Sequence, residues 1–301
     1  MISIIVCSVN PDMYEEFTEN VKETIGVEYE IICFDNREKR WGICKVYNHC
    51  IEKAKYPYIC LVHEDMYFFT KGWGKILIDF HSFTPNCGVI GFAGSSLVDN
   101  TFVQWKIDKK TSKVNTTLSQ HKGLPVTPDN LKCFFNSKNE FESVLVLDGM
   151  FLFTSRRICN DVKFDEMMLD NFHIYDTDFT FTVSLKYNNY VCSKIDNMHR
   201  CKSSLSNEYI NGLLAFHKKR RDYLPSSIKH INRIHLWLIK NHEILEFSSI
   251  LRKNSISGEK YLVLMKEFNS NYCINGVYKI IDFFYRKVMN IKIRKKTLSK
   301  E

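Results

Sequence analysis

The amino-terminal part of the chain alternates between continuous apolar runs and segments in which apolar residues recur every three or four positions. The runs at 2–9, 29–34 and 58–62 are typical of strands covered on both faces. The spacing over 13–21 and 43–54 predicts two helices, each with one buried stripe. Because strands and helices alternate, we expect an α/β fold with a mainly parallel sheet and helices on both faces.

The pattern continues along the chain with one interruption. A helix is predicted around 73–80 and a strand at 88–93. From about Leu97 to Glu142 the apolar periodicity gives way to Lys, Thr, Ser and Asn, which predicts a long insertion that covers the functional site. Later apolar runs predict strands at 143–147, 150–153 and 190–192 and a helix that begins near residue 176.

Polar residues follow the ends of the first three predicted strands. Asn10 follows the first strand, Asp35 ends the second, and His63-Glu64-Asp65 follows the third. In an open parallel sheet these ends lie on one edge, where ligands bind. Carboxylates gathered there repel each other unless a cation or a proton lies between them, and oxygen ligands with an imidazole favour Mn²⁺ or Mg²⁺. Each acid taken alone is equally typical of a turn.

Two further polar groups lie later in the chain. Asp176 and Asp178 precede a predicted helix, where they serve either as catalytic carboxylates or as helix caps. His199 follows the last predicted strand and is either a ligand or a hydrogen-bonded buried histidine. Their position after strands places them at the same edge as the earlier group.

Charge divides the chain into two regions. Residues 218–301 hold 19 Lys and Arg against 7 Asp and Glu, a net charge of +12, whereas residues 1–217 carry a net −4. We therefore expect a domain at 1–207 and a basic helical region at 208–301. The basic region favours an anionic partner such as a membrane surface. The alternative is that its charged residues simply form a solvated face. No basic-aromatic module supports nucleic-acid binding.

Cysteine usage and hydropathy bear on the compartment. The 11 cysteines form no CxxC pair, and an odd count favours a reducing compartment. The amino terminus does not resemble a secretory signal, and no run reaches the roughly 18 apolar residues of a membrane span. We expect a cytoplasmic protein that associates peripherally with the inner face of the cell membrane.

The order of these motifs resembles a known family over about residues 1–205. The motifs are Ser3 to Ser8 with Asn10, then Asp35, Tyr47-Asn48, His63-Glu64-Asp65, Asp148-Gly149, Tyr175 to Asp178, and His199. Together they resemble a GT-A glycosyltransferase of the family 2 type, closest to the subgroup related to the streptomycin-biosynthesis glycosyltransferase-like domain. Two residues depart from the family pattern: Tyr47 replaces an Arg, and His63 replaces the first Asp of the Asp-x-Asp motif.

The resemblance implies roles for individual residues. Those that would bind the nucleotide are Ser8, Asn10, Asp35, Asn48, His63 and Glu64. Asp65 and His199 would bind a divalent cation, Mn²⁺ or Mg²⁺. Asp148 and Gly149 would lie on the acceptor side. Asp176 would act as the general base, with Asp178 as a supporting carboxylate.

The implied activity is sugar transfer. The expected enzyme is a metal-dependent, inverting glycosyltransferase that moves a sugar from a nucleotide-diphosphate donor, a UDP-sugar, to a glycan or lipid-linked acceptor in polysaccharide biosynthesis. The alternative is a non-catalytic GT-A module that binds nucleotide and metal, because His63 departs from the motif. A third, weaker alternative is a scaffold that anchors to membranes through the basic region.

Overall fold

The structure is a computed structural model. It describes residues 1–99, 112–114, 117–119, 131–133, 139–167, 172–200, 207–231, 233–253, 256, 261 and 263–266. The chain forms two compact units: unit 1 comprises Met1–Val98, Asp108–Ser204 and Ser226–Lys229, and unit 2 comprises Asp99–Ile107, Leu205–Pro225 and His230–Glu301. All the predicted site residues belong to unit 1.

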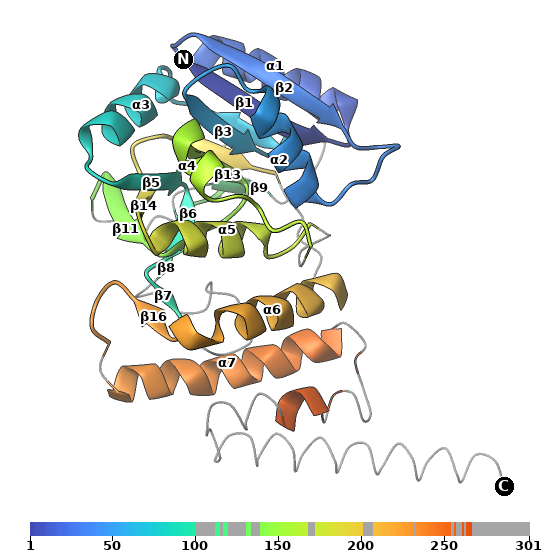
Figure 1. Cartoon of the computed structure of the whole chain (residues 1–301), viewed down its shortest axis with the longest axis vertical. Helices are drawn as coiled ribbons and strands as arrows, with labels where there is room; N and C mark the ends of the chain where they lie inside the picture. Colours follow the sequence, from blue (N-terminus) through green and yellow to red (C-terminus); the bar gives the residue numbers. More distant parts are fainter. Residues whose placement is uncertain are drawn as a thin grey trace, which may run out of the picture. The chain divides into compact units, whose positions relative to one another are not determined.

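Unit 1 is built on a seven-stranded sheet with the order β11-β14-β5-β13-β3-β1-β2 (Figure 1). Its strands are β1 (Ile2–Ser8), β2 (Tyr29–Asp35), β3 (Tyr58–Val62), β5 (Cys87–Gly91), β11 (Phe141–Val144), β13 (Phe151–Ser155) and β14 (Asn188–Cys192). β1 pairs in parallel with β2 and β3, and β5 pairs in parallel with β14. β13 runs antiparallel between β3 and β5. The predicted mixed, mainly parallel sheet is confirmed.

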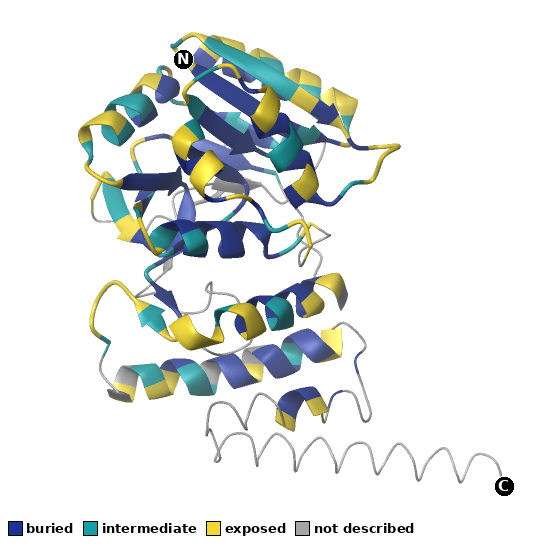
Figure 2. Cartoon of the chain, in the orientation of Figure 1, coloured by how far each residue is buried: buried dark blue, intermediate teal, exposed yellow. Residues whose placement is uncertain are grey.

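The helices of unit 1 follow the predicted apolar stripes. They are α1 (Pro11–Thr24), α2 (Ile43–Lys53), α3 (Trp73–Phe83), α4 (Arg156–Asp161) and α5 (Tyr175–Ser184). In α2 the residues at helical spacing from Ile43 to Ile51 are buried, as the pattern requires. Figure 2 shows the central strands buried between these helices. The short helix α4 has no clear periodic signal in the sequence.

Strand direction decides which polar residues share an edge. The parallel register of β1 with β2 places Ser8 opposite Asp35, at the carboxyl ends of both strands. Because β13 is antiparallel, its first residue, Phe151, pairs with Val62 at the end of β3. The segment before β13 therefore lies at the same edge, and the amide of His63 donates to the carbonyl of Met150 at 3.0 Å.

The chain enters a smaller sheet directly after β3. The strand order of this sheet is β10-β9-β15-β4. Its strands are β4 (Met66–Phe68), β9 (Thr117–Ser119), β10 (Leu131–Cys133) and β15 (Asn197–His199). β4 is held by the buried side chain of Asn20, which donates to the carbonyl of Phe68 at 3.0 Å and accepts from its amide at 2.8 Å. This reciprocal pair fixes the chain just after His63-Glu64-Asp65.

The predicted insertion at 97–142 is described only in part. Its described strands are β7 (Leu97–Val98), β8 (Ser112–Val114), β9, β10 and the beginning of β11. β7 pairs with β16 (Ser226–Ser227), and β8 pairs with β6 (Ala93–Ser95). β6 also pairs with β12 (Val146–Leu147). The expectation that the insertion covers the site falls largely outside the described residues.

The described part of unit 2 is helical. It contains α6 (Asn207–Arg220), the 3₁₀ helix η3 (Arg221–Tyr223) and α7 (Arg233–Lys253). Phe247 and Leu251 of α7 are fully buried, and Ser248 shares a 2.7 Å hydrogen bond with the hydroxyl of Tyr261. Among the described residues, no helix has the length and apolar character that crossing a membrane requires. The described part of the predicted C-terminal helical region is therefore helical.

Candidate active site and metal centre

Three side chains converge at the edge where β3 ends. His63 and Asp65 lie in the turn between β3 and β4, and His199 is the last residue of β15. One potential ligand atom from each lies within 4.8 Å of the others. The pairing of β15 with β4 places His199 opposite Met66, which brings it next to Asp65. Sequence reasoning assigned Asp65 and His199 to a metal and His63 to the nucleotide, but the structure places all three in one cluster.

The surroundings favour an ionised Asp65 and a neutral His63. Burial raises the pKa of the Asp65 carboxyl, but the close approach and charge of His199 outweigh this effect, and the pKa falls to about 2. Burial lowers the pKa of His63, and the neighbouring His199 lowers it further. An ionised carboxylate and a neutral imidazole are the forms that bind cations.

The donor set also fits a cation. Nε2 of His199 is buried and makes no well-aligned hydrogen bond, although Oδ1 of Asp65 lies 3.2 Å away. A buried nitrogen in this situation is costly unless another group satisfies it. Two imidazoles and one carboxylate form a set that transition-metal ions accept more readily than Mg²⁺ does. The residues present therefore fit a divalent metal ion such as Mn²⁺.

The residues predicted to lie on the acceptor side, Asp148 and Gly149, lie beside this cluster, and Gly149 holds Asp176. The amide of Gly149 donates to Oδ2 of Asp176 at 2.7 Å, and the amide of Thr177 donates to Oδ1 at 2.8 Å. Asp148 accepts from the amide of Met150 at 3.2 Å. Backbone donors thus orient both oxygens of the buried Asp176 carboxylate.

The start of α5 is constrained. Ile174, just before the helix, has φ +64°, a left-handed conformation that is unusual for a β-branched residue. Such strain costs about 1–3 kcal/mol and is typical of functional sites. It places Asp176 and Asp178 in the first turn, where both are buried. The predicted helix start is confirmed.

Tyr175 is a site residue that sequence reasoning did not single out. Its hydroxyl lies 3.0 Å from Nε2 of His63 and donates to the carbonyl of Gly149 at 3.3 Å. A Cβ on Gly149 would lie 2.1 Å from this hydroxyl, so only glycine fits there. The apolar periodicity contains no signal for this contact, because it joins three segments that are far apart in sequence.

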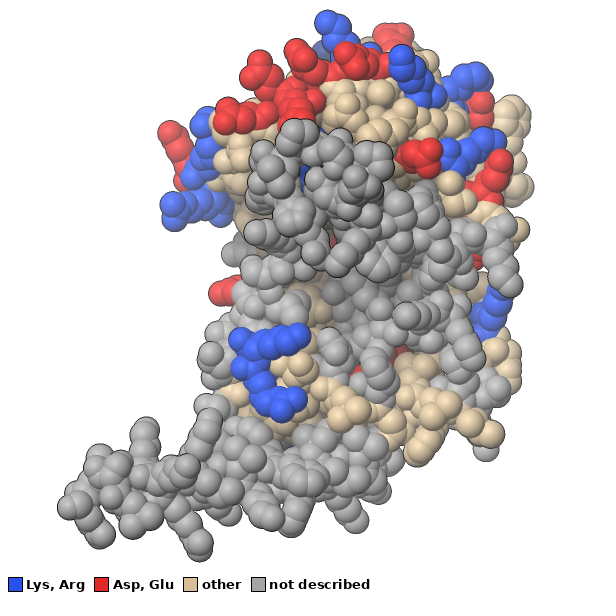
Figure 3. All heavy atoms as spheres, turned by 180° about the vertical axis from the view of Figure 1, so that it is seen from behind, with Lys and Arg blue, Asp and Glu red and all other residues tan. Residues whose placement is uncertain are grey.

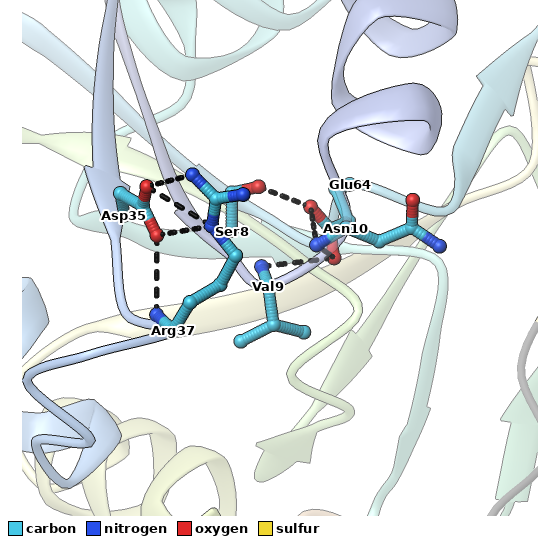
Figure 4. A network of polar contacts seen from close by, with 6 residues as sticks. All are labelled: Ser8, Val9, Asn10, Asp35, Arg37 and Glu64. Atoms are coloured by element: carbon cyan, nitrogen blue, oxygen red, sulfur yellow. Dashed lines mark hydrogen bonds and ion pairs between the residues drawn. The ribbon is translucent and has the colours of Figure 1, made fainter.

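The predicted nucleotide-binding residues of the first strand are joined by Glu64 (Figure 4). The Glu64 carboxylate accepts from the hydroxyl of Ser8 at 2.5 Å and from the amides of Val9 and Asn10 at 3.2 and 3.0 Å. The Asn10 side chain accepts from the amide of Met13 and caps α1. Glu64 therefore points towards β1 rather than into the cluster of His63, Asp65 and His199.

Asp35 and Asn48, two further predicted nucleotide contacts, also have protein partners. The exposed carboxylate of Asp35 forms an ion pair with Arg37 and accepts from its amide (Figure 4). Asn48 makes reciprocal hydrogen bonds of 3.0 and 3.1 Å with the backbone of Phe164. Both side chains are thus held by partners within the chain, and their binding to a nucleotide stays a prediction.

An aromatic and cationic group lies next to Asp35 and was not predicted. The Trp41 ring packs 5.0 Å from Phe34 and 5.5 Å from His49, and the Nζ atoms of Lys39 and Lys45 lie over it at 5.1 and 4.3 Å. This group follows β2, so it is placed at the carboxyl edge of the sheet. The signal in the sequence was the run of Lys and Trp after Asp35.

Comparison with known proteins decides the family. Residues 3–219 match the family described as "Glycosyltransferase like family". The chain belongs to this family. It is a glycosyltransferase, and its likeness to the streptomycin-related subgroup stays a prediction.

Solved structures are similar to this glycosyltransferase at low sequence identity. GalNAc-T7, solved with UDP, GalNAc and Mn²⁺, is 9% identical with a TM-score of 0.51, over 90% of this chain and 58% of that one. The mannosyltransferase PcManGT from Pyrobaculum calidifontis was solved with GDP-Man and Mn²⁺. It is 8% identical with a TM-score of 0.43, and the match covers 93% of this chain and 73% of that one. TarS from S. aureus is 13% identical with a TM-score of 0.43, and the match covers 90% of this chain and 88% of that one. No curated protein sequence matches the chain. The likeness to GalNAc-T7 shows the GT-A fold.

Proposed function

We propose that this glycosyltransferase is metal-dependent and inverting, and that it moves a sugar from a UDP-sugar to a glycan or lipid-linked acceptor in polysaccharide biosynthesis. The observation that supports the proposal best is the convergence of His63, Asp65 and His199 within 4.8 Å, at the sheet edge that also holds Asp176. Metal ligands and a candidate base on one edge are what transfer from a nucleoside diphosphate needs. The UDP and Mn²⁺ bound by GalNAc-T7 are consistent with this donor and cofactor.

The metal-binding cluster has a defined task in this proposal. His63, Asp65 and His199 hold the cation, which supplies positive charge to the diphosphate leaving group. The low pKa of Asp65, about 2, keeps its carboxylate ionised at every physiological pH. The two imidazoles favour Mn²⁺ over Mg²⁺, which prefers oxygen ligands.

The carboxylates of α5 act on the acceptor. Asp176 takes the proton of the attacking hydroxyl, a role for which its two backbone hydrogen bonds hold it in a single orientation. Asp178, in the same helical turn, supports it electrostatically. A single base on the side opposite the leaving group produces in-line displacement, and the anomeric configuration is inverted.

A combined binding and turnover assay tests the proposal. The full chain is incubated with Mn²⁺ and a panel of nucleotide sugars, with and without candidate acceptors, while thermal stability and nucleotide release are recorded. We expect stabilisation by Mn²⁺ with a UDP-sugar, together with slow UDP release. Asp65→Ala should abolish both effects, whereas Asp79→Ala, which removes an exposed carboxylate of α3, should leave them unchanged.

Each negative result has a distinct meaning. Stabilisation without nucleotide release, for any acceptor, would favour a binding module over the proposed transferase activity. If Mn²⁺ has no effect and Asp65→Ala behaves as the natural chain does, the metal dependence is wrong.

We also propose that unit 2 brings the enzyme to an anionic membrane surface. The last turn of α6 contains His217, Lys218, Lys219 and Arg220, and Figure 3 shows Lys and Arg predominating among the described charged side chains of unit 2. α7 exposes an apolar stripe, which consists of Ile234, Trp237, Leu238 and Leu245 with exposed fractions of 74, 58, 53 and 51%. Basic residues near an apolar helical stripe with a Trp are typical of helices that lie in a membrane interface.

Vesicle binding tests this partner. The full chain should sediment with vesicles that contain phosphatidylglycerol but not with pure phosphatidylcholine, and added salt should weaken binding. Trp237→Ser with Leu238→Ser should weaken binding, as should Lys218→Gln with Arg221→Gln. The control Phe83→Ser removes an exposed aromatic side chain of α3 and should have no effect. Equal binding by all variants would exclude this surface.

A further inference from the structure

The hydroxyl of Tyr175 lies between a metal-cluster side chain and a backbone carbonyl. It is 3.0 Å from Nε2 of His63 and 3.3 Å from the oxygen of Gly149. A carbonyl oxygen only accepts hydrogen bonds, so the single tyrosine proton is directed to Gly149. The Tyr175 oxygen is then left as an acceptor, and the hydrogen bond with His63 requires a proton on Nε2 of the imidazole.

We propose that Tyr175 is a positioning residue that holds His63 in the tautomer protonated on Nε2, so that Nδ1 is the nitrogen that binds the metal. The inference rests on the metal centre of the proposed function. A histidine that binds a metal through one ring nitrogen commonly donates its other N–H to an oxygen acceptor, which fixes the tautomer and the ring orientation. A tyrosine oxygen occupies that place here.

Packing makes the Tyr175 hydroxyl a rigid acceptor. The side chain is only 4% exposed. Its ring packs edge-on against Tyr47 at 5.8 Å and at a tilt against Phe164 at 6.3 Å. On the other side, a Cβ on Gly149 would clash with the hydroxyl at 2.1 Å. The oxygen therefore cannot follow His63 if the imidazole rotates, and it selects one ring orientation.

The same glycine connects this contact to the candidate base. Gly149 accepts from Tyr175 through its carbonyl and donates through its amide to Oδ2 of Asp176 at 2.7 Å. Tyr175 and Asp176 are neighbours in the first turn of α5. One backbone segment thus sets the position of a metal ligand and of the acceptor-side carboxylate.

Tyr175→Phe tests the inference because it removes only the hydroxyl. Mn²⁺ affinity, measured by titration calorimetry or by the EPR signal of free Mn²⁺, should fall about 10–100-fold, the usual effect of losing a hydrogen-bond partner of a metal ligand. The control is Tyr58→Phe, a half-buried tyrosine at the first position of β3, at the opposite end of the strand from His63, whose ring stacks on Phe153. It should leave Mn²⁺ affinity unchanged.

A spectroscopic measurement reports the tautomer directly. In the metal-free chain with ¹⁵N-labelled histidine, His63 should be protonated on Nε2, and its N–H should exchange slowly with water. In Tyr175→Phe that signal should exchange rapidly while the melting temperature shows the chain still folded. A proton on Nδ1 in the natural chain would overturn the inference.

The metal titration separates failure of the inference from failure of the proposed function. If the natural chain binds Mn²⁺ and Tyr175→Phe binds it equally well, the positioning role is wrong and the metal centre stands. Tighter binding by Tyr175→Phe would show that Nε2 is the ligand nitrogen and that Tyr175 competes with the metal. If the natural chain and Tyr58→Phe both fail to bind Mn²⁺, the proposed metal centre itself is overturned, and the inference with it.

Discussion

The Nε2 atom of His199 lies 3.2 Å from Oδ1 of Asp65, although the two residues belong to opposite halves of the described unit 1 sequence. Strand pairing causes this proximity, since β15 runs antiparallel to β4 with His199 opposite Met66. His199 is also the largest influence that lowers the pKa of the Asp65 carboxyl against the opposing effect of burial. The two side chains therefore act as one unit, and changing either should alter the other.

Removing His199 should weaken the proposed metal site in two ways. His199→Ala deletes one ligand and lets the pKa of Asp65 rise from about 2. Loss of a residue that only hydrogen-bonds a metal ligand lowers affinity roughly 10–100-fold, and we expect Mn²⁺ affinity to fall at least that much here. Calorimetry measures the affinity, and ¹³C NMR follows the Asp65 titration. The exposed His230→Ala is the control, and an unchanged affinity in His199→Ala would remove this residue from the site.

Asp176 and Asp178 should separate into different roles when each is changed to Asn. In Asp176→Asn an amide group replaces one acceptor, so the amide of Gly149 or Thr177 loses its partner, at a cost of about 1–3 kcal/mol. Loss of the base should also lower the rate about 10²–10⁴-fold. Asp178→Asn should lower the rate less. Urea unfolding and product formation measure the two effects, and a fully active Asp176→Asn would contradict the base assignment.

Glu64 should be a structural anchor of the first strand. Its carboxylate accepts from the Ser8 hydroxyl and the amides of Val9 and Asn10 (Figure 4). Because hydrogen bonds to a charged group contribute roughly 1.5–3 kcal/mol, Glu64→Ala should lower the free energy of unfolding by that amount. Glu19→Ala, an exposed change on α1, should have little effect. Equal unfolding midpoints for the two variants would argue against this role.

The stability of the chain should depend on pH through His217 of α6. Burial lowers the pKa of this imidazole from 6.5 to about 3 in the folded state. Between these values the unfolded chain binds a proton that the folded chain does not, so stability falls as the pH is lowered, by up to about 1.4 kcal/mol per pH unit. Urea unfolding between pH 7 and 5 should show this slope, and His217→Phe should reduce it.

Asp65 does not interfere with that measurement. Its folded pKa of about 2 lies below the unfolded value, so its stabilising contribution is complete above about pH 4 and is lost only as the pH falls towards 2. Parallel pH dependence in the natural chain and in His217→Phe would show that His217 is not the group responsible.

Local patterns in the sequence were sufficient for the main elements of the fold. The apolar runs at the start of the chain become β1, β2 and β3, and the periodic segments between them become α1 and α2. The physical reason is that burial of an apolar face depends on the spacing of neighbouring residues. The same reasoning did not find α4, which is short, or the division of the run at 143–147 between β11 and β12.

The sequence by itself determined which residues reach the functional edge of the sheet, because the end of an apolar strand and the polar residues that follow it are local features of the sequence. Only the tertiary structure decided which of them meet. It joined His63 to Asp65 and His199, turned Glu64 towards Ser8, and placed the Tyr175 hydroxyl against His63 and Gly149. These contacts depend on an antiparallel β13, the pairing of β15 with β4 and the packing of α5. Such long-range pairing is not encoded in the spacing of any single segment.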